Sequence, residues 1–221
     1  MEIKPIGYIK NGFCDKFGIP RQSGISSSVS EIIIEKEYSD INAFRGIEEF
    51  SHIWLIWEFS RMKSEKFCPT VRPPRLGGNK RVGVFATRSP NRPNSLGLTL
   101  VELKGIKQTE CGIILEVVGA DILSGTPIYD IKPYLPSFEC VPNAIGGFSD
   151  ENFSHRLEVV FGEENHKKIS PEKMTEITEL LACDPRPSYQ DDTARVYGLK
   201  YDGIEIKFRV DNDKLFVISI E

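Results

Sequence analysis

The chain has 221 residues, of which 40% are hydrophobic and 27% are charged, and its net charge is −4. This composition is typical of a globular protein, and the length allows one large core or a larger domain with a smaller appendage. No apolar run reaches the ~18 residues of a membrane span, and the N-terminal residues lack the apolar core of a secretion signal. The five cysteines are scattered and form no Cys-x-x-Cys pair, so we expect a cytoplasmic protein without disulfides or zinc.

Short runs rich in β-branched and aromatic residues predict strands in the first half of the chain. No long helix is predicted between them, which favours a closed or half-closed β-barrel. No strand leads into a Gly-x-Gly-x-x-Gly turn, so a Rossmann-type cofactor site is not expected. The predicted strands cover residues 5–9, 29–35, 52–59, 82–87, 98–106 and 113–118.

The strand-like runs end before residues 142–152, and the composition of this segment predicts a linker. A Ser-Pro-Glu sequence at 170–172 predicts a helix start, and the helix should end before Pro185. Residues 204–210 alternate between apolar and charged side chains between two tight turns, which predicts a half-buried strand. We therefore expect a mainly β, α+β chain: a β-barrel domain over residues 1–145 and a small C-terminal α+β domain over 146–221. In the second domain one helix would cover a three-stranded antiparallel meander.

Positive charge is concentrated in one segment. Residues 61–92 contain nine basic residues and one acidic residue, so this segment carries +8 and the rest of the chain −12. Such a concentration favours an anionic partner, of which nucleic-acid phosphates are the commonest. The alternative is a loop whose charges pair with acids elsewhere in the fold. The candidate RNA-binding residues are Arg72, Arg75, Lys80, Arg81, Arg92 and, in the turn after the predicted helix, Arg186.

Two further motifs suggest a site rather than a core. Residues 85–97 carry a dense group of side-chain donors and prolines where a strand ends, which adds nothing to packing and is more typical of function. Asp130, Lys132 and Tyr134 would share one face of an extended segment; the alternative is a solvated strand with an incidental ion pair. The three histidines have no metal-ligand spacing, and we expect no metal site.

Together these motifs resemble the TsaA/TrmO family, and most closely its bacterial members, the tRNA (adenine-N6)-methyltransferases. The resemblance spans residues 5–145 in many ordered blocks and reappears in the second domain. The blocks are Pro20-Arg-Gln22, Phe50-Ser-His-Ile-Trp54, Arg72-Pro-Pro-Arg-Leu-Gly-Gly-Asn79, Gly83-Val-Phe-Ala-Thr-Arg88, Arg92-Pro-Asn94, Gly125-Thr-Pro127, Asp130-Ile-Lys-Pro-Tyr-Leu-Pro136 and Asp184-Pro-Arg-Pro187.

The resemblance implies a β-barrel methyltransferase domain, a homodimer and S-adenosylmethionine as the methyl donor. It implies as substrate the N6-threonylcarbamoyladenosine 3′ to the anticodon of threonine tRNA. The chain departs from the family pattern at Ser60-Arg61, where bacterial members carry His-Gln, and at Ser124, where they often carry an acid. The cofactor-binding positions carried over by motif are Pro20, Arg21, Gln22, Ser60, Arg61, Arg88, Leu98, Asp121, Ile122, Leu123 and Ser124.

The implied reaction moves a methyl group from a sulfonium to a nitrogen, and alignment of the two reactants can supply much of the rate. The nitrogen must also lose a proton, so a base is wanted. Asp130 and Tyr134 are the candidate catalytic bases, and Lys132 or Arg92 would bind the substrate's carboxylate or a phosphate. The alternative function is a non-catalytic RNA-binding module with a basic barrel face.

Overall fold

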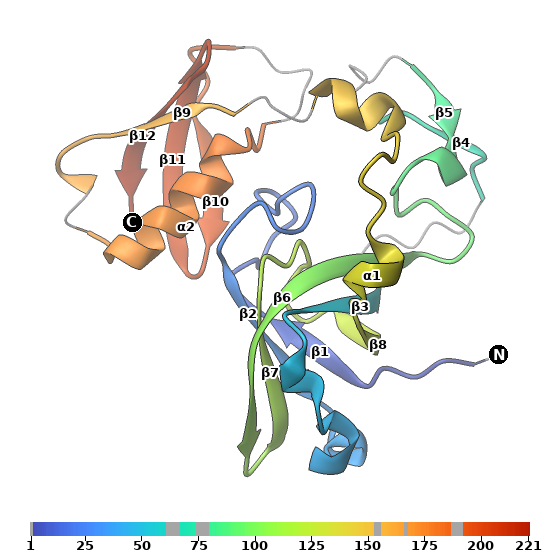
Figure 1. Ribbon diagram of the computed structural model, residues 1–221. Coiled ribbons are helices and arrows are strands. Elements are labelled where there is room, and N and C mark those ends of the chain that lie inside the picture. The colour runs from blue at the N-terminus through green and yellow to red at the C-terminus, as the bar shows by residue number, and fades with distance from the viewer. Residues whose placement is uncertain (1, 61–66, 74–79, 153–155, 166–167, 187–191) are drawn as a thin grey trace.

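The computed structural model describes residues 2–60, 67–73, 80–152, 156–165, 168–186 and 192–221. The first half of the chain forms a closed barrel of antiparallel strands, in the order β1-β2-β7-β6-β3-β8 (Figure 1). This confirms the predicted β-barrel. Its strands are β1 (Gly7–Lys10), β2 (Val29–Ile34), β3 (His52–Glu58), β6 (Leu96–Thr109), β7 (Gly112–Val118) and β8 (Pro127–Pro133).

The barrel closes because its strands alternate between buried and half-exposed residues. In β3, Ile53, Leu55 and Trp57 are buried, while the residues between them are half-buried on the outer face. The inward residues of all six strands fill the interior, so the barrel is a packed core and not a channel. Between β2 and β3 the chain forms three short 3₁₀ turns, Lys36–Tyr38, Ile41–Phe44 and Ile47–Glu49.

The strand predicted at residues 82–87 is wrong over most of its length. Only β5 (Val82–Gly83) is extended, paired with β4 (Thr70–Val71), and a 3₁₀ turn follows at Val84–Ala86. The pairing edges of β6 are already taken by β3 and β7, so these β-forming residues have no barrel strand to pair with. After β8 the chain forms the one-turn helix α1 (Pro136–Glu139) and a 3₁₀ segment at Gly147–Asn152.

The C-terminal part is an α+β unit. Helix α2 (Pro171–Ala182) begins at Ser170, whose side chain accepts a hydrogen bond from the Lys173 amide, as the sequence predicted. The antiparallel meander is present, but the sheet has a fourth strand, in the order β10-β11-β12-β9. The added strand pairs in parallel with β12. The strands are β9 (Glu158–Phe161), β10 (Tyr197–Tyr201), β11 (Ile204–Asp211) and β12 (Lys214–Ile220).

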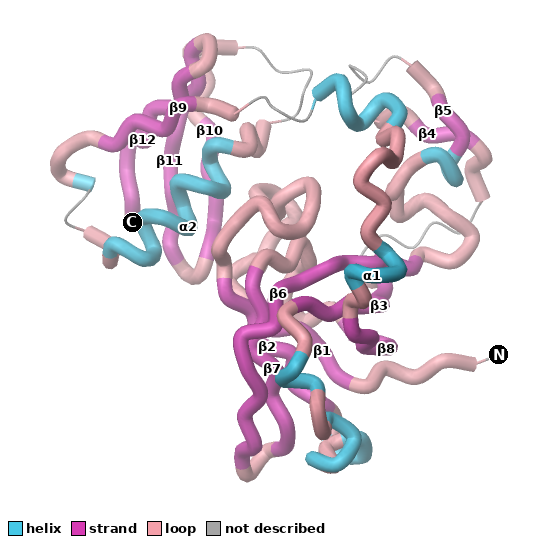
Figure 2. The backbone as a smooth tube through the Cα atoms, in the orientation of Figure 1, coloured by secondary structure: helices cyan, strands magenta, loops and turns pink. Residues whose placement is uncertain are grey.

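The loop between β1 and β2 joins the two units, and Figure 2 shows it lying between the barrel and α2. Phe13 from this loop is 2% exposed and belongs to the hydrophobic core of the C-terminal unit. Gly18 has a φ of 93°, and a Cβ there would collide with Leu199. The Asp202 amide also donates to the Gly12 carbonyl at 2.9 Å. No helix within the described ranges is long and apolar enough to cross a membrane.

Candidate cofactor site

A cavity of about 490 Å³ lies where the β1–β2 loop meets one end of the barrel. Four segments that are far apart in the sequence build its wall. They contribute Lys16, Ile19, Pro20, Arg21 and Gln22; Trp57, Phe59 and Ser60; Thr87, Arg88, Pro90, Arg92, Leu96, Gly97, Leu98 and Thr99; and Asp121, Leu123 and Thr126.

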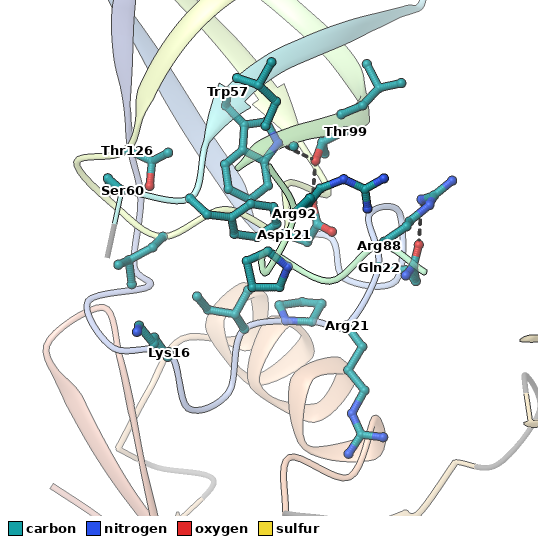
Figure 3. A pocket seen from close by; sticks show the side chains of 18 of the residues that line it. Lys16, Arg21, Gln22, Trp57, Ser60, Arg88, Arg92, Thr99, Asp121 and Thr126 are labelled. Atoms are coloured by element: carbon teal, nitrogen blue, oxygen red, sulfur yellow. Dashed lines mark hydrogen bonds between the residues drawn. The ribbon is translucent and has the colours of Figure 1, made fainter. Parts of the chain in front are cut away.

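A chain of hydrogen bonds fixes one carboxylate in this cavity (Figure 3). The indole Nε1 of Trp57 donates to Oγ1 of Thr99 at 2.9 Å, and the Thr99 hydroxyl donates to Oδ1 of Asp121 at 2.8 Å. The barrel register makes this possible, because Trp57 pairs with Gly97 and a Cβ at Gly97 would collide with the indole. The Asp121 carboxylate is therefore held in one orientation.

Burial raises the pKa of the Asp121 carboxyl above its usual range, although the Thr99 hydrogen bond and the charge of Arg88 act in the opposite direction. Desolvation of the ionised form is the largest of these effects. The ionised form of a buried carboxylate is stabilised when a cationic group of a ligand binds beside it.

Cationic and amide groups line the rest of the wall. Arg88 donates to the side-chain oxygen of Gln22 at 2.8 Å, which links two of the segments. Arg92 is held by a 2.7 Å hydrogen bond to the Thr87 carbonyl. The Arg21 guanidinium turns away from Asp121, as Figure 3 shows, and donates to the carbonyls of Asp184 and Arg186. Arg21 thus ties the cavity wall to the turn after α2.

The structure brings together most of the positions that the family resemblance carried over. Eight of them line the cavity: Pro20, Arg21, Gln22, Ser60, Arg88, Leu98, Asp121 and Leu123. Ile122 instead points into the barrel core, and its carbonyl accepts from Asn11. Ser124 accepts through its hydroxyl from the Asn11 amide at 3.2 Å. Arg61 lies outside the described residues.

The three candidate catalytic residues share the outer face of the barrel and do not line this cavity. Lys132 and Asp130 form an ion pair at 3.0 Å; the Lys132 side chain is largely exposed to solvent, and that of Asp130 is about half exposed. Tyr134 packs edge-on against Trp54, with ring centroids 6.0 Å apart.

A second cavity of about 380 Å³ adjoins the first, since Arg92 and Leu96 line both. Tyr129 and Glu58 also line it, and the Tyr129 hydroxyl donates to the Glu58 carboxylate at 2.7 Å. This hydrogen bond raises the pKa of Tyr129 to about 12, so the phenol stays protonated at neutral pH. Sequence reasoning missed Glu58 and Tyr129, as it missed Trp57 and Thr99, because all four read as ordinary strand residues.

The candidate RNA-binding residues fall into two groups. Arg72 and Lys80 are exposed, and Arg81 is exposed but donates to the Thr70 hydroxyl. Arg92 is half-buried at the cavity, whereas Arg186 is folded onto Asp184 in a 2.9 Å ion pair. Arg75 lies outside the described residues. Among the residues that the structure describes, no three His, Cys, Asp or Glu side chains gather to hold a metal.

The fold and the cavity define a class of protein: a small closed β-barrel, fused to an α+β unit, with a cavity where the β1–β2 loop meets one end of the barrel. The comparisons with known proteins agree with this class. Residues 8–140 match the family model of the tRNA-methyltransferase O N-terminal domain, and residues 154–221 match that of the TrmO C-terminal domain. The chain belongs to the tRNA-methyltransferase O family.

The relatives described here match over three quarters of the chain or more. A tRNA (adenine(37)-N6)-methyltransferase of Escherichia coli K12 is 37% identical over 229 residues, covering 100% of this chain and 97% of the relative. A protein of that name from Eikenella corrodens is 45% identical over 172 residues, covering 77% of this chain and 97% of the relative. The crystal structure of TrmO from Pseudomonas aeruginosa superimposes with a TM-score of 0.79 at 29% identity, covering 100% of this chain and 98% of that one.

Proposed function

We propose that this chain transfers a methyl group from S-adenosylmethionine to N6 of an adenine in the anticodon loop of tRNA. Its membership of the family supports this activity, since a relative that matches along its full length is named for it. The observation that carries the proposal is the cavity, where Asp121 is fixed by Thr99 beside an apolar wall. A tRNA substrate also favours a cytoplasmic location.

The residues present fit S-adenosylmethionine. About 490 Å³ lies within the range of cavities that bind cofactors of this size. Trp57, Phe59 and Leu98 offer apolar surface to an adenine, Asp121 offers an anion to a cationic group, and Arg88 offers a guanidinium to a carboxylate. The cofactor would supply an electrophilic methyl group on a sulfonium, and these wall residues would hold and orient it.

The finer proposal is that the acceptor is N6-threonylcarbamoyladenosine in threonine tRNA. Its carboxylate needs a cation near the methyl donor, and two candidates exist. Arg92 lines both cavities and is oriented by the Thr87 carbonyl, whereas Lys132 is paired with Asp130 away from them. We therefore assign the carboxylate to Arg92. The second cavity, which Arg92 shares, provides space for the acceptor.

Of the two candidate bases, Asp130 would take the proton from N6, because burial raises the pKa of Tyr134 and keeps its phenol protonated at neutral pH. Tyr134 would then contact the substrate without acting as the base. Both lie on the outer face of the barrel, so the reacting nitrogen must reach this face as well as the methyl group. The homodimer that the family resemblance implies offers one arrangement, in which the outer face of one subunit borders the cavity of its partner. The chain would then complete its site only as a dimer.

Methyl transfer can be tested directly. Purified protein, radiolabelled S-adenosylmethionine and tRNA from cells that lack this gene should yield label in an N6-methylated adenosine derivative, identified by mass spectrometry. Protein heated before the assay serves as the control. A protein that binds this tRNA but shows no affinity for S-adenosylmethionine in calorimetry would instead be a non-catalytic RNA-binding module.

Replacing Arg72 should weaken tRNA binding and reduce its salt dependence. Each phosphate contact contributes about 0.7–0.9 to the log–log slope of affinity against salt. Arg72→Ala should therefore lower that slope by roughly one unit in a filter-binding titration and leave cofactor affinity unchanged. Lys200→Ala, an exposed cation of the C-terminal sheet, is the matched control and should leave the slope as it is. An unaltered slope for Arg72→Ala would assign this charge a structural role.

A further inference from the structure

Two exposed aromatic rings lie beside the cofactor cavity. Phe85 and Phe67 are 71% and 58% exposed, and their stacked rings have centroids 6.5 Å apart and an interplanar angle of 29°. The guanidinium carbon of Arg92 lies 5.9 Å from the centroid of the Phe85 ring. Arg92 also lines the cavity, so the rings stand at its edge. We call Phe67, Phe85 and Arg92 the aromatic platform.

The local backbone holds these rings outward. Val84 is 1% exposed and anchors the 3₁₀ turn, and its amide donates to the Pro69 carbonyl at 2.9 Å. The Thr87 amide and hydroxyl both donate to the Val84 carbonyl, and Thr87 lines the cavity. Since the turn is tied on both sides, Phe85 is displayed on a fixed support and not on a free loop. Side chains of this size and exposure commonly mark a binding surface.

The charge around the platform indicates what binds there. Residues 67–101 include six arginines and lysines and contain no aspartate or glutamate. Of these cations, Arg88 and Arg92 lie at the cavity, and Arg72, Lys80 and Arg81 are exposed. A combination of aromatic faces and unneutralised positive charge suits single-stranded nucleic acid, in which bases stack on rings and phosphates meet cations. It does not suit an apolar protein partner.

We propose that the aromatic platform stacks an unpaired base of the tRNA anticodon loop beside the adenine that is methylated. The choice of tRNA rests on the proposed function, whereas the stacking of a single-stranded base rests on the rings and charges described above. Phe85 supplies the ring face, Phe67 supports it, and the Arg92 guanidinium adds a cation over the same ring. Because every base has a π-face, the platform positions the loop without reading its sequence.

Two substitutions of Phe85 separate stacking from apolar contact. Phe85→Leu keeps an apolar side chain but removes the ring, and should weaken binding of threonine tRNA about 5- to 100-fold. Phe85→Trp keeps a π-face and should bind this tRNA within about threefold of the unchanged protein. Affinity for S-adenosylmethionine, melting temperature and mass in solution should stay the same in both. Phe138→Leu, at another exposed phenylalanine on α1, is the matched control and should bind tRNA normally.

Equal tRNA affinity of Phe85→Leu and the unchanged protein would overturn the proposal. A fall in the mass of Phe85→Leu in solution would also overturn it, since the rings would then be a subunit contact. A Phe85→Leu variant that binds tRNA normally but no longer binds anionic lipid vesicles would overturn it as well, since the rings would then contact lipid. If the protein binds tRNA through Phe85 but transfers no methyl group, the platform stands and the proposed function fails.

Discussion

Threonine tRNA that carries the threonylcarbamoyl group should be methylated at least ~10⁴-fold faster than the same tRNA transcribed in vitro. The modification turns N6 into a ureido nitrogen, which loses its proton more readily than an exocyclic amine. It also adds a carboxylate that can pair with Arg92 at the junction of the two cavities. When unmodified adenine is bound, this guanidinium has no carboxylate of the substrate to pair with. A site that leaves such a charged group unpaired discriminates strongly against the substrate that lacks the partner. Initial rates on the two tRNAs, at equal concentrations, measure the effect.

The same assay on Arg92→Gln tests the assignment of the carboxylate. This variant should lose most of its rate on the modified tRNA, so the ratio between the two tRNAs should shrink. Lys132→Gln provides the comparison, because the alternative assignment would place the loss there. Comparable rates of the unchanged protein on both tRNAs would contradict the substrate and the role of Arg92 together.

Asp121→Asn should weaken S-adenosylmethionine binding about 10- to 100-fold, the loss expected for one charge-assisted contact. The same change should stabilise the protein without cofactor, because the buried carboxylate no longer has to ionise. An increase of about 1 kcal/mol, or about 2–4 °C in melting temperature, is the expected order. Calorimetric titration and thermal unfolding measure the two effects. Glu116→Gln, which removes a surface ion pair with Lys107, should change neither the affinity nor the pH dependence.

The pH dependence provides a second measurement on Asp121, with opposite signs for stability and for binding. The folded-state pKa of this carboxyl is raised, so its contribution to stability is greatest at low pH and is lost as pH rises through that pKa. Cofactor affinity changes the other way, because the ionised form pairs with the cation, and it should fall as pH falls through the same pKa. The other charged side chains that line the same cavity are Lys16, Arg21, Arg88 and Arg92. Asp121→Asn should remove the contribution of this residue to both dependences. An affinity that does not depend on pH in the unchanged protein would contradict the pairing.

The sequence predicted five of the six barrel strands because a run of β-branched and aromatic residues is a local signal that each strand carries by itself; β8 was not among the predicted strands. Residues 204–210 were predicted from their period-two alternation, and the helix start from the capping sequence at Ser170, which are local signals as well. The fourth strand, β9, was missed since it is four residues long and pairs in parallel with β12, more than 50 residues later. The two strands are not joined by a turn, so no local sequence signal predicts that they pair.

Only some residues of the candidate site were predicted from the sequence. The motifs indicated Arg88 and Asp121 through a family resemblance, and the structure brings both to one cavity. The hydrogen-bonded chain from Trp57 through Thr99 could not be seen, because it depends on the register between β3 and β6. Phe85 was likewise predicted to lie in a strand. Its segment forms a 3₁₀ turn, because no barrel strand has a free edge with which it could pair.

The insertion of Phe13 into the C-terminal core has a consequence for how this chain can be divided. A protease cut after the barrel, or a gene that encoded the barrel alone, would uncover Phe13 together with Phe17 and Ile19. The excised C-terminal unit would lack a fully buried phenylalanine, a loss on the order of 3–5 kcal/mol. The two halves are therefore not interchangeable modules. We expect the two halves to unfold in one cooperative transition, since the β1–β2 loop of one half forms part of the core of the other.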